Sequence, residues 1–289
     1  MSDPTDGAVV TVPLGVRVTL ARPAIQLIAE EARADILHIK GDAVDPRLRP
    51  VTAPGTDVDA IVRPSHVSRL DAALRAHGWT VYSSFAFGSP FGHAQTYLHE
   101  IWGYFDLHRL FPGIRLEPSA AFDLMWADRH PIRLAAGVGS APSIEDQAAL
   151  LVLNSARSAA PAADPLRTWV DAPGLDRSAV EARIDLLRAR VAFAAATGDL
   201  DSYRGAPDYA LWRAITRGGS RGAEWWGRIR AADSVSSAVM IAARAPLVNV
   251  ERLQHELGRR PTRREIMRAF FARPARALRE LASRSTSRS

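Results

Sequence analysis

The spacing of apolar residues changes near residue 140, and this change constrains the fold more than any other feature of the chain. Before it, short β-rich runs at residues 36–39 and 58–62 alternate with stretches of helical spacing. After it, apolar residues recur at helical spacing between prolines. We therefore expect an α+β fold. A small mixed β-sheet with flanking helices would occupy residues 1–140, and an all-helical domain would occupy residues 141–289.

The same patterns predict individual elements. In the first part they indicate helices over residues 22–34 and 65–77, and strands over residues 36–39, 58–62, 80–85 and 102–107. In the second part they indicate a helix that opens at Ser143, and further helices over residues 177–196, 208–215, 234–243, 250–257 and 262–271. The polar segment around His93 and His99 is expected to be a surface loop, and Trp225 and Trp226 are expected to anchor a core.

Composition excludes several classes of protein. The chain has no cysteine, so it holds neither disulfides nor thiolate metal sites. No apolar run approaches the ~18 residues that a membrane-spanning helix needs. The first seven residues are acidic and polar, and they lack the basic region with which a secretory signal begins. We therefore expect a soluble, cytoplasmic protein with no membrane partner.

Positive charge is concentrated in the last third of the chain. Residues 203–289 contain 18 arginines against 7 acidic residues, whereas the whole chain has a net charge of only +6. A basic face of this kind suits RNA, an anionic membrane or an acidic partner. A solvated helical surface is the other interpretation, and we favour it. Residues 283–289 contain no apolar side chain, and a disordered tail is expected there.

Two pairs of polar residues lie at strand spacing in the first part of the chain. Asp57 and Asp59 are separated by one residue, as are Asp106 and His108, so each pair projects from one face of its expected strand. Carboxylates that point together repel one another unless a cation lies between them. We therefore expect a site for Mg²⁺ or Mn²⁺, which prefer oxygen ligands, at Asp57, Asp59 and Asp106. On the same grounds, Asp59→Asn is expected to leave the stability of the metal-free protein unchanged or raised.

Lys40 is the only lysine of a chain that has 37 lysine and arginine residues in total. It follows the β-rich residues 36–39 and directly precedes Gly41. An ammonium group is more compact and more strongly hydrated than a guanidinium group, so the two are not interchangeable. Glycine allows a ligand to approach the backbone closely. Lys40 and Gly41 are therefore a candidate contact for phosphate.

Taken together, these segments resemble the polymerase-beta-type nucleotidyltransferase superfamily and, within it, a largely uncharacterised bacterial branch. That branch carries Lys-Gly on its first strand, an arginine before an Asp-x-Asp motif, and Asp/Glu-x-His-Trp on a later strand. The resemblance extends over about residues 24–110 and rests on Ile39-Lys40-Gly41, Arg49-Pro50, Thr56-Asp57-Val58-Asp59-Ala60-Ile61-Val62 and Phe105-Asp106-Leu107-His108-Arg109. The chain departs from the pattern at Asp42, where Ser or Gly is usual, and at Arg109, where Trp is usual.

The resemblance implies a nucleotidyltransferase-like fold and a set of residue roles. Asp57 and Asp59 would hold the metal ions that bridge the triphosphate of an NTP, and Asp106 would bind one ion and help to activate the acceptor oxygen. Lys40 and Gly41 would lie against the phosphates. The resemblance assigns three further residues to the nucleotide site: Arg49, Thr56 and His108.

The function that we expect is metal-dependent transfer of a nucleoside monophosphate from an NTP, such as ATP, to a hydroxyl or phosphate group. The acceptor is an unidentified small molecule, RNA or protein. Two alternatives stay open from the sequence. A glycosyltransferase would use Asp57 and Asp59 to hold the metal of a sugar nucleotide, although its acidic pair usually follows several nucleotide-binding strands. A non-enzymatic, arginine-rich module would bind RNA or another partner on a decayed fold of the same type.

Overall fold

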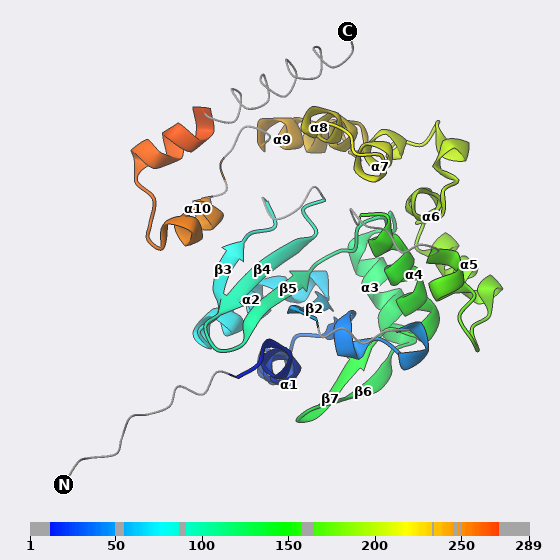
Figure 1. Cartoon of the computed structure of the whole chain (residues 1–289), viewed down its shortest axis with the longest axis horizontal. Helices are drawn as coiled ribbons and strands as arrows, with labels where there is room; N and C mark the ends of the chain where they lie inside the picture. The colour runs from blue at the N-terminus through cyan, green and yellow to red at the C-terminus, as the bar shows by residue number, and fades with distance from the viewer. Residues whose placement is uncertain are drawn as a thin grey trace.

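The structure is a computed structural model that describes residues 12–49, 55–86, 91–157, 165–232, 234–244, 248 and 250–271. Its centre is a five-stranded sheet in the order β1-β2-β5-β4-β3 (Figure 1). β2 and β5 run parallel, and the other neighbours run antiparallel, so the expected mixed sheet is confirmed. The tail expected at residues 283–289 lies outside the described residues. The strands are β1 (Ile36–His38), β2 (Asp57–Val62), β3 (Thr80–Ser83), β4 (Ala94–His99) and β5 (Gly103–His108).

One face of the sheet is covered by α1 (Leu14–Glu31) and α2 (Val67–Ala76). Successive residues of a strand point to opposite faces. Val58, Ala60 and Val62 of β2 therefore share one side, where they are buried in a core with these two helices. The acidic residues of β2 consequently project from the opposite face of the sheet.

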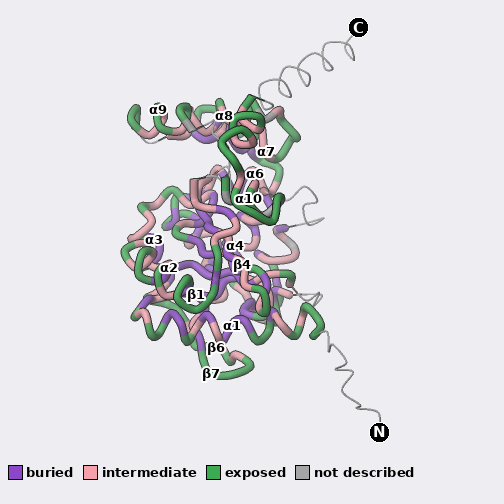
Figure 2. Tube along the Cα trace, turned by 90° about the vertical axis from the view of Figure 1, so that its left-hand side faces the viewer, coloured by how far each residue is buried: buried purple, intermediate pink, exposed green. Residues whose placement is uncertain are grey.

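The opposite face carries a second core. Leu37, Ile39 and Ile61 of the sheet region belong to one buried cluster with residues of α3 (Pro118–Ala127) and α4 (Ile144–Ser155). Figure 2 shows buried chain running through α4, β4 and β1, whereas α8 and α9 are largely exposed or half-buried. Because this core contains residues from both sides of residue 140, the sheet and the first helices of the second part pack together.

A separate two-stranded sheet precedes the helical part and was not predicted. β6 (His130–Leu134) and β7 (Gly137–Ala141) form an antiparallel hairpin, and β7 lies beside β1. Gly139 of β7 faces the buried His38, because a Cβ atom added at Gly139 would lie 3.0 Å from His38 Cδ2. Proline and glycine are poor strand formers, so Pro131 and the glycines of β7 masked this hairpin in the sequence.

After Ala141, every element in the described part of the chain is a helix or a helical turn. The predicted single helix over residues 177–196 is wrong, because Arg188 adopts a left-handed backbone conformation (φ 53°) and separates two helices. None of the helices in the described ranges is long and apolar enough to cross a bilayer. The elements are a helical turn at Leu166–Val170, α5 (Arg177–Leu186), α6 (Arg190–Thr197), α7 (Tyr209–Thr216), α8 (Arg221–Arg230), α9 (Val235–Arg244), α10 (Val250–Leu257) and a helix over residues 263–271.

Three further predictions need correction. The first helix begins at Leu14, well before the expected start. The segment around His93 and His99 is not a surface loop: it forms β4, which pairs with both β3 and β5, and His93 is buried. Its polar residues favour a loop in the sequence, but in the structure this inner strand uses them for hydrogen bonds. Trp226 does not anchor a core, since it is 60 % exposed on α8.

Candidate active site

The register of β2 against β5 assembles the candidate site. Asp59 is the direct neighbour of Asp106 across the parallel pair, and Asp57 lies one alternation earlier on the same face of β2. One ligand atom from each of Asp59, Asp106 and His108 lies within 4.8 Å of the other two. The structure therefore brings together two of the three predicted carboxylates and the predicted histidine, with Asp57 beside them.

Asp59 is almost fully buried, and its Oδ1 atom has two partners. Lys40 Nζ lies 2.5 Å from this oxygen, and His108 Nε2 lies 2.9 Å from it. Burial disfavours the charged carboxylate, but Lys40 and the hydrogen bond from His108 outweigh burial and hold the pKa of Asp59 well below its usual range. Burial lowers the pKa of His108, so a neutral imidazole donates through Nε2–H to an ionised Asp59.

Asp57 lies in a different electrostatic environment from Asp59. Burial, together with the negative charges of Asp59 and Asp106, raises the pKa of Asp57 to about 6. Lys40 opposes this shift without cancelling it. The predicted Thr56 is exposed, and its hydroxyl lies 3.4 Å from Asp57 Oδ1. The site therefore contains a surplus of negative charge near Asp57.

The raised pKa of Asp57 predicts that the metal-free protein loses stability as the pH rises from about 4 to about 6. In this window the folded state binds more protons at Asp57 than the unfolded chain does, so its contribution to the free energy of unfolding falls with pH. Allowing for partial exposure, the loss is about 1–2 kcal/mol. Chemical denaturation in EDTA at both ends of the window measures it. Asp57→Asn should lack this component, and an unchanged pH dependence in that variant would contradict the prediction.

Asp106 is held by the neighbouring strand β4. Thr96 and Asp106 are partners in the antiparallel register, and the Thr96 hydroxyl donates to Asp106 Oδ1 over 2.6 Å. This hydrogen bond fixes one carboxylate oxygen of a half-buried side chain. Sequence reasoning missed Thr96 because its segment was expected to be a loop.

Gly41 begins the short helical turn Gly41–Ala43 that follows β1, in a backbone conformation that only glycine adopts without strain. Its φ of 58° is left-handed. In addition, a Cβ atom at this position would lie 2.9 Å from Arg22 Nη2, so the Arg22 guanidinium packs against the glycine backbone. Arg22 of α1 therefore lies beside the predicted Lys40-Gly41 pair.

Arg22 is a site residue that sequence reasoning missed. It is 3 % exposed, and its Nε and Nη1 atoms have no hydrogen-bond partner among the described residues. Burial lowers the pKa of Arg22, while the charges of Asp42 and Asp59 oppose this shift. A charged residue between Ala21 and Pro23, in an apolar stretch of helix, was the available signal. Buried donors without partners beside a glycine turn suit an anionic ligand.

Two more residues near the carboxylates, Arg157 and His93, were not among the predicted site residues. Arg157, just beyond the end of α4, is half-buried, and burial lowers the pKa of its guanidinium while the charges of Asp59 and Asp106 oppose this shift. The His93 ring lies 5.1 Å from the His108 ring, centre to centre, and burial holds the pKa of His93 far below its usual value. Both residues come from segments whose position near β5 depends on tertiary packing.

Arg49 and Asp42 form an ion pair at the edge of the site. Arg49 Nη1 lies 3.1 Å from Asp42 Oδ1, and the Thr19 hydroxyl lies 3.5 Å from Asp42 Oδ2. The Asp42 side chain is 58 % exposed. Asp42 is therefore paired with an arginine side chain and directed toward solvent.

The residues present fit a divalent cation. The negative charges of Asp59 and Asp106 raise the pKa of Asp57. Of these three carboxylates, Lys40 contacts only that of Asp59. Because Oδ1 of Asp59 already accepts from Lys40 and His108, its Oδ2 atom is the one suited to an ion. Carboxylate oxygens are the ligands that Mg²⁺ and Mn²⁺ prefer. Such a cation would balance the surplus negative charge at Asp57.

Comparison of the chain with models of known protein families finds no match. A search of curated proteins finds no relative either. The function is therefore inferred from the chemistry of the site itself.

Proposed function

We propose that this protein is a metal-dependent nucleotidyltransferase that moves a nucleoside monophosphate from an NTP to a hydroxyl or phosphate group of an acceptor. The observation that carries the proposal is the β2–β5 register, which sets Asp59 beside Asp106 with Asp57 on the same face. Two cationic side chains adjoin this acidic group: the half-buried Lys40 contacts Asp59, and the buried Arg22 has donors without partners in the described part of the chain. A cation site next to an anion site suits a metal-bound triphosphate.

Each group has a role in this proposal. Asp57, Asp59 and Asp106 would hold Mg²⁺ or Mn²⁺, which stabilises charge on the entering and leaving oxygens of an in-line displacement. Arg22 and Lys40 bind phosphate oxygens through charge-assisted hydrogen bonds. The second carboxylate oxygen of Asp106, the one to which Thr96 does not donate, accepts the proton of the acceptor hydroxyl.

The test is transfer from NTPs labelled in the α-phosphate. The protein is incubated with each NTP, with Mg²⁺ or Mn²⁺, and with a cell extract that supplies acceptors. We expect metal-dependent transfer of label to an acceptor, with release of pyrophosphate. Parallel reactions with labelled sugar nucleotides test the glycosyltransferase alternative. Failure of every NTP to bind in calorimetry with either metal ion would overturn the proposal.

Lys40→Arg is expected to weaken NTP binding or turnover about fivefold or more while the fold stays intact. The ammonium group lies 2.5 Å from Asp59 Oδ1 and the Lys40 side chain is only 27 % exposed, so the site offers little room for a larger, planar guanidinium. Calorimetry with an NTP and Mg²⁺ measures the change, and Arg129→Lys, at an exposed residue that follows α3, is the control. If Lys40→Arg binds and turns over like the wild type, the single lysine has no specific role.

A further inference from the structure

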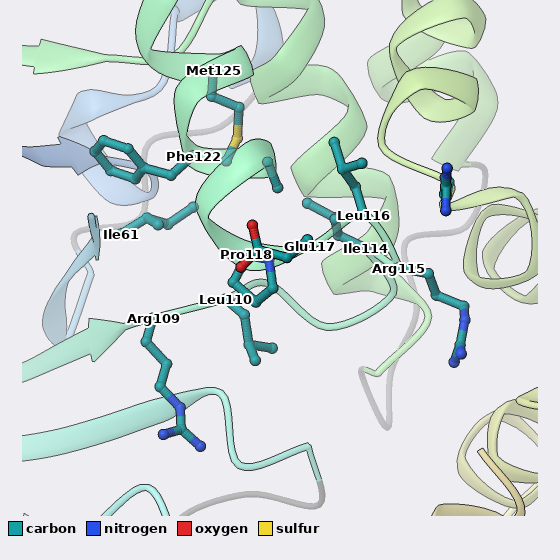
Figure 3. A pocket seen from close by; sticks show the side chains of 12 residues that line it. Ile61, Arg109, Leu110, Ile114, Arg115, Leu116, Glu117, Pro118, Phe122 and Met125 are labelled. Atoms are coloured by element: carbon teal, nitrogen blue, oxygen red, sulfur yellow. The ribbon is translucent and has the colours of Figure 1, made fainter. Parts of the chain in front are cut away.

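The arginines beside the pocket between the end of β5 and the start of α3 do not converge on it. This pocket has a volume of about 380 Å³ (Figure 3). Arg109 and Arg115 lie on opposite sides of it, and Figure 3 shows their guanidinium groups pointing away from each other. Arginines share one side of an element elsewhere, on the last described helix, residues 263–271.

This helix has one exposed side and one half-buried side. Its exposed residues are spaced by three and four positions, the spacing at which side chains share one side of a helix. The residues between them, at positions 265, 266, 269 and 270, are half-buried and form the other side. Three arginines and two apolar side chains therefore share the side that faces solvent. This arginine face consists of Arg263, Arg264, Met267, Arg268 and Phe271.

The three arginines of this face have no acidic partner among the described residues. Glu265 is the only acidic residue between positions 257 and 271. Its Oε1 atom accepts from Arg259 Nη2 over 2.6 Å, and its Oε2 atom accepts from Thr262 N over 2.7 Å, in a capping box at the start of the helix. The carboxylate is therefore engaged away from the arginine face, whose positive charges are open to an external anion.

The arginine face belongs to the second of two helices that a short turn connects. The first, α10, lies beside the edge strand β3 and ends at Gly258, which has a left-handed backbone (φ 65°). Residues 258–262 lead from there into the second helix, which lies at the edge of the molecule in Figure 1. Helix-turn-helix proteins use such a second helix, with polar residues on its exposed side, to enter the major groove of DNA.

The mixture of side chains on the arginine face favours double-stranded DNA over other polyanions. The major groove of B-DNA admits an α-helix, whereas the major groove of duplex RNA is too deep and narrow for side chains to read. A helix that lies on a membrane needs a continuous apolar side, but here Met267 and Phe271 alternate with arginines. In a DNA groove, arginines bind phosphate oxygens and apolar side chains contact thymine methyl groups.

We propose that the arginine face binds double-stranded DNA, with the helix in the major groove and Arg263, Arg264 and Arg268 on backbone phosphates. Phosphate contacts carry no sequence information, so the binding does not depend on one base sequence. The proposal concerns a different set of residues from the carboxylate site and stands whether or not NTPs are substrates.

The experiment measures fluorescence anisotropy of a labelled DNA duplex of mixed sequence with the full chain, in EDTA and without NTP. We expect binding that weakens as the KCl concentration rises, because each neutralised phosphate releases counterions. Unlabelled competitors at equal concentrations of negative charge then compare the polyanions. Duplex RNA, single-stranded DNA, poly-L-glutamate and phosphatidylserine vesicles should each displace the label less effectively than unlabelled duplex DNA. Equal or better displacement by any of these four, or no binding of the duplex, would overturn the proposal.

Arg263→Gln combined with Arg264→Gln tests the arginine face itself. Because each phosphate contact contributes about 0.9 to the slope of log K against log salt concentration, losing two should reduce the slope by about 1.8. Arg263→Lys with Arg264→Lys keeps both charges and should keep the slope. Arg69→Gln with Arg133→Gln is the matched control, since it removes two charges from exposed residues of α2 and β6. An unchanged slope in the first variant, or an equal reduction in the control, would exclude the proposed contacts. Melting temperatures by circular dichroism confirm that each variant is folded.

Discussion

Asp59→Asn is expected to lower nucleotidyl transfer about 10³-fold, because a metal ligand contributes several kcal/mol to charge stabilisation in the transition state. The same substitution should lower the free energy of unfolding by about 1–2 kcal/mol. Asp59 is buried, and it accepts from both Lys40 and His108 through one oxygen. Removing its charge leaves the Lys40 ammonium without its carboxylate partner.

Asp57→Asn is the matched control for this prediction. Its carboxylate lies on the same strand, but its pKa is raised, because burial and its acidic neighbours disfavour the charged form. Asp57→Asn should therefore lower transfer while the stability of the metal-free protein at neutral pH is unchanged or raised. Turnover of labelled NTP and urea denaturation in EDTA measure the two effects. Equal stability changes for both variants would contradict the distinction.

Asp146→Ala is expected to lower the free energy of unfolding by about 3 kcal/mol, a large part of the stability of an ordinary domain. Asp146 on α4 is fully buried and forms two hydrogen bonds of 2.7 and 2.6 Å with the Arg183 guanidinium of α5. Arg183 also pairs with Asp128, just after α3, over 2.9 Å. The substitution leaves a mostly buried guanidinium with only its more exposed acidic partner.

The control for Asp146→Ala is another arginine pair on the same helix. Arg177 and Glu181 lie one turn apart on α5, with a 3.0 Å contact, and both are solvent-accessible. Exposed pairs of this kind contribute about 0.3–0.5 kcal/mol, so Arg177→Ala should change stability only slightly. Chemical denaturation followed by circular dichroism compares the two variants. A similar small loss for Asp146→Ala would show that the buried pair does not hold α3, α4 and α5 together.

Much of the sheet and its acidic face could be predicted because alternation along a strand is a local property. Asp57 and Asp59 share a face whatever their neighbours are, and the same holds for Asp106 and His108. Helix α4 begins where Ser143 predicts, since its side chain accepts from Asp146 N. In contrast, β4 was missed, because its polar residues are satisfied only by partners on other elements.

The residues that contact the candidate carboxylates could be identified only from the tertiary structure. Sequence reasoning treated Asp59 as a carboxylate repelled by its neighbours, whereas folding gives it a lysine and a histidine. The sequence alone predicts that Asp59→Asn leaves the stability of the metal-free protein unchanged or raised. The structure predicts the opposite, because the substitution removes the partner of Lys40. Arg22 and Arg157 were missed because Arg22 comes from α1 and Arg157 follows α4, and both lie outside the predicted motifs.

The sequence alone therefore determined which side chains share the acidic face of the sheet and from which residue the chain has helical spacing. Both follow from the spacing of residues that are close together in the chain. Only the tertiary structure decided that β2 lies parallel to β5 with Asp59 beside Asp106, and that Arg22 packs on Gly41. Strand register and helix placement are set by which apolar surfaces can be buried together across long separations in the chain. Those surfaces determine the environment, and hence the charge and chemistry, of each side chain in the site.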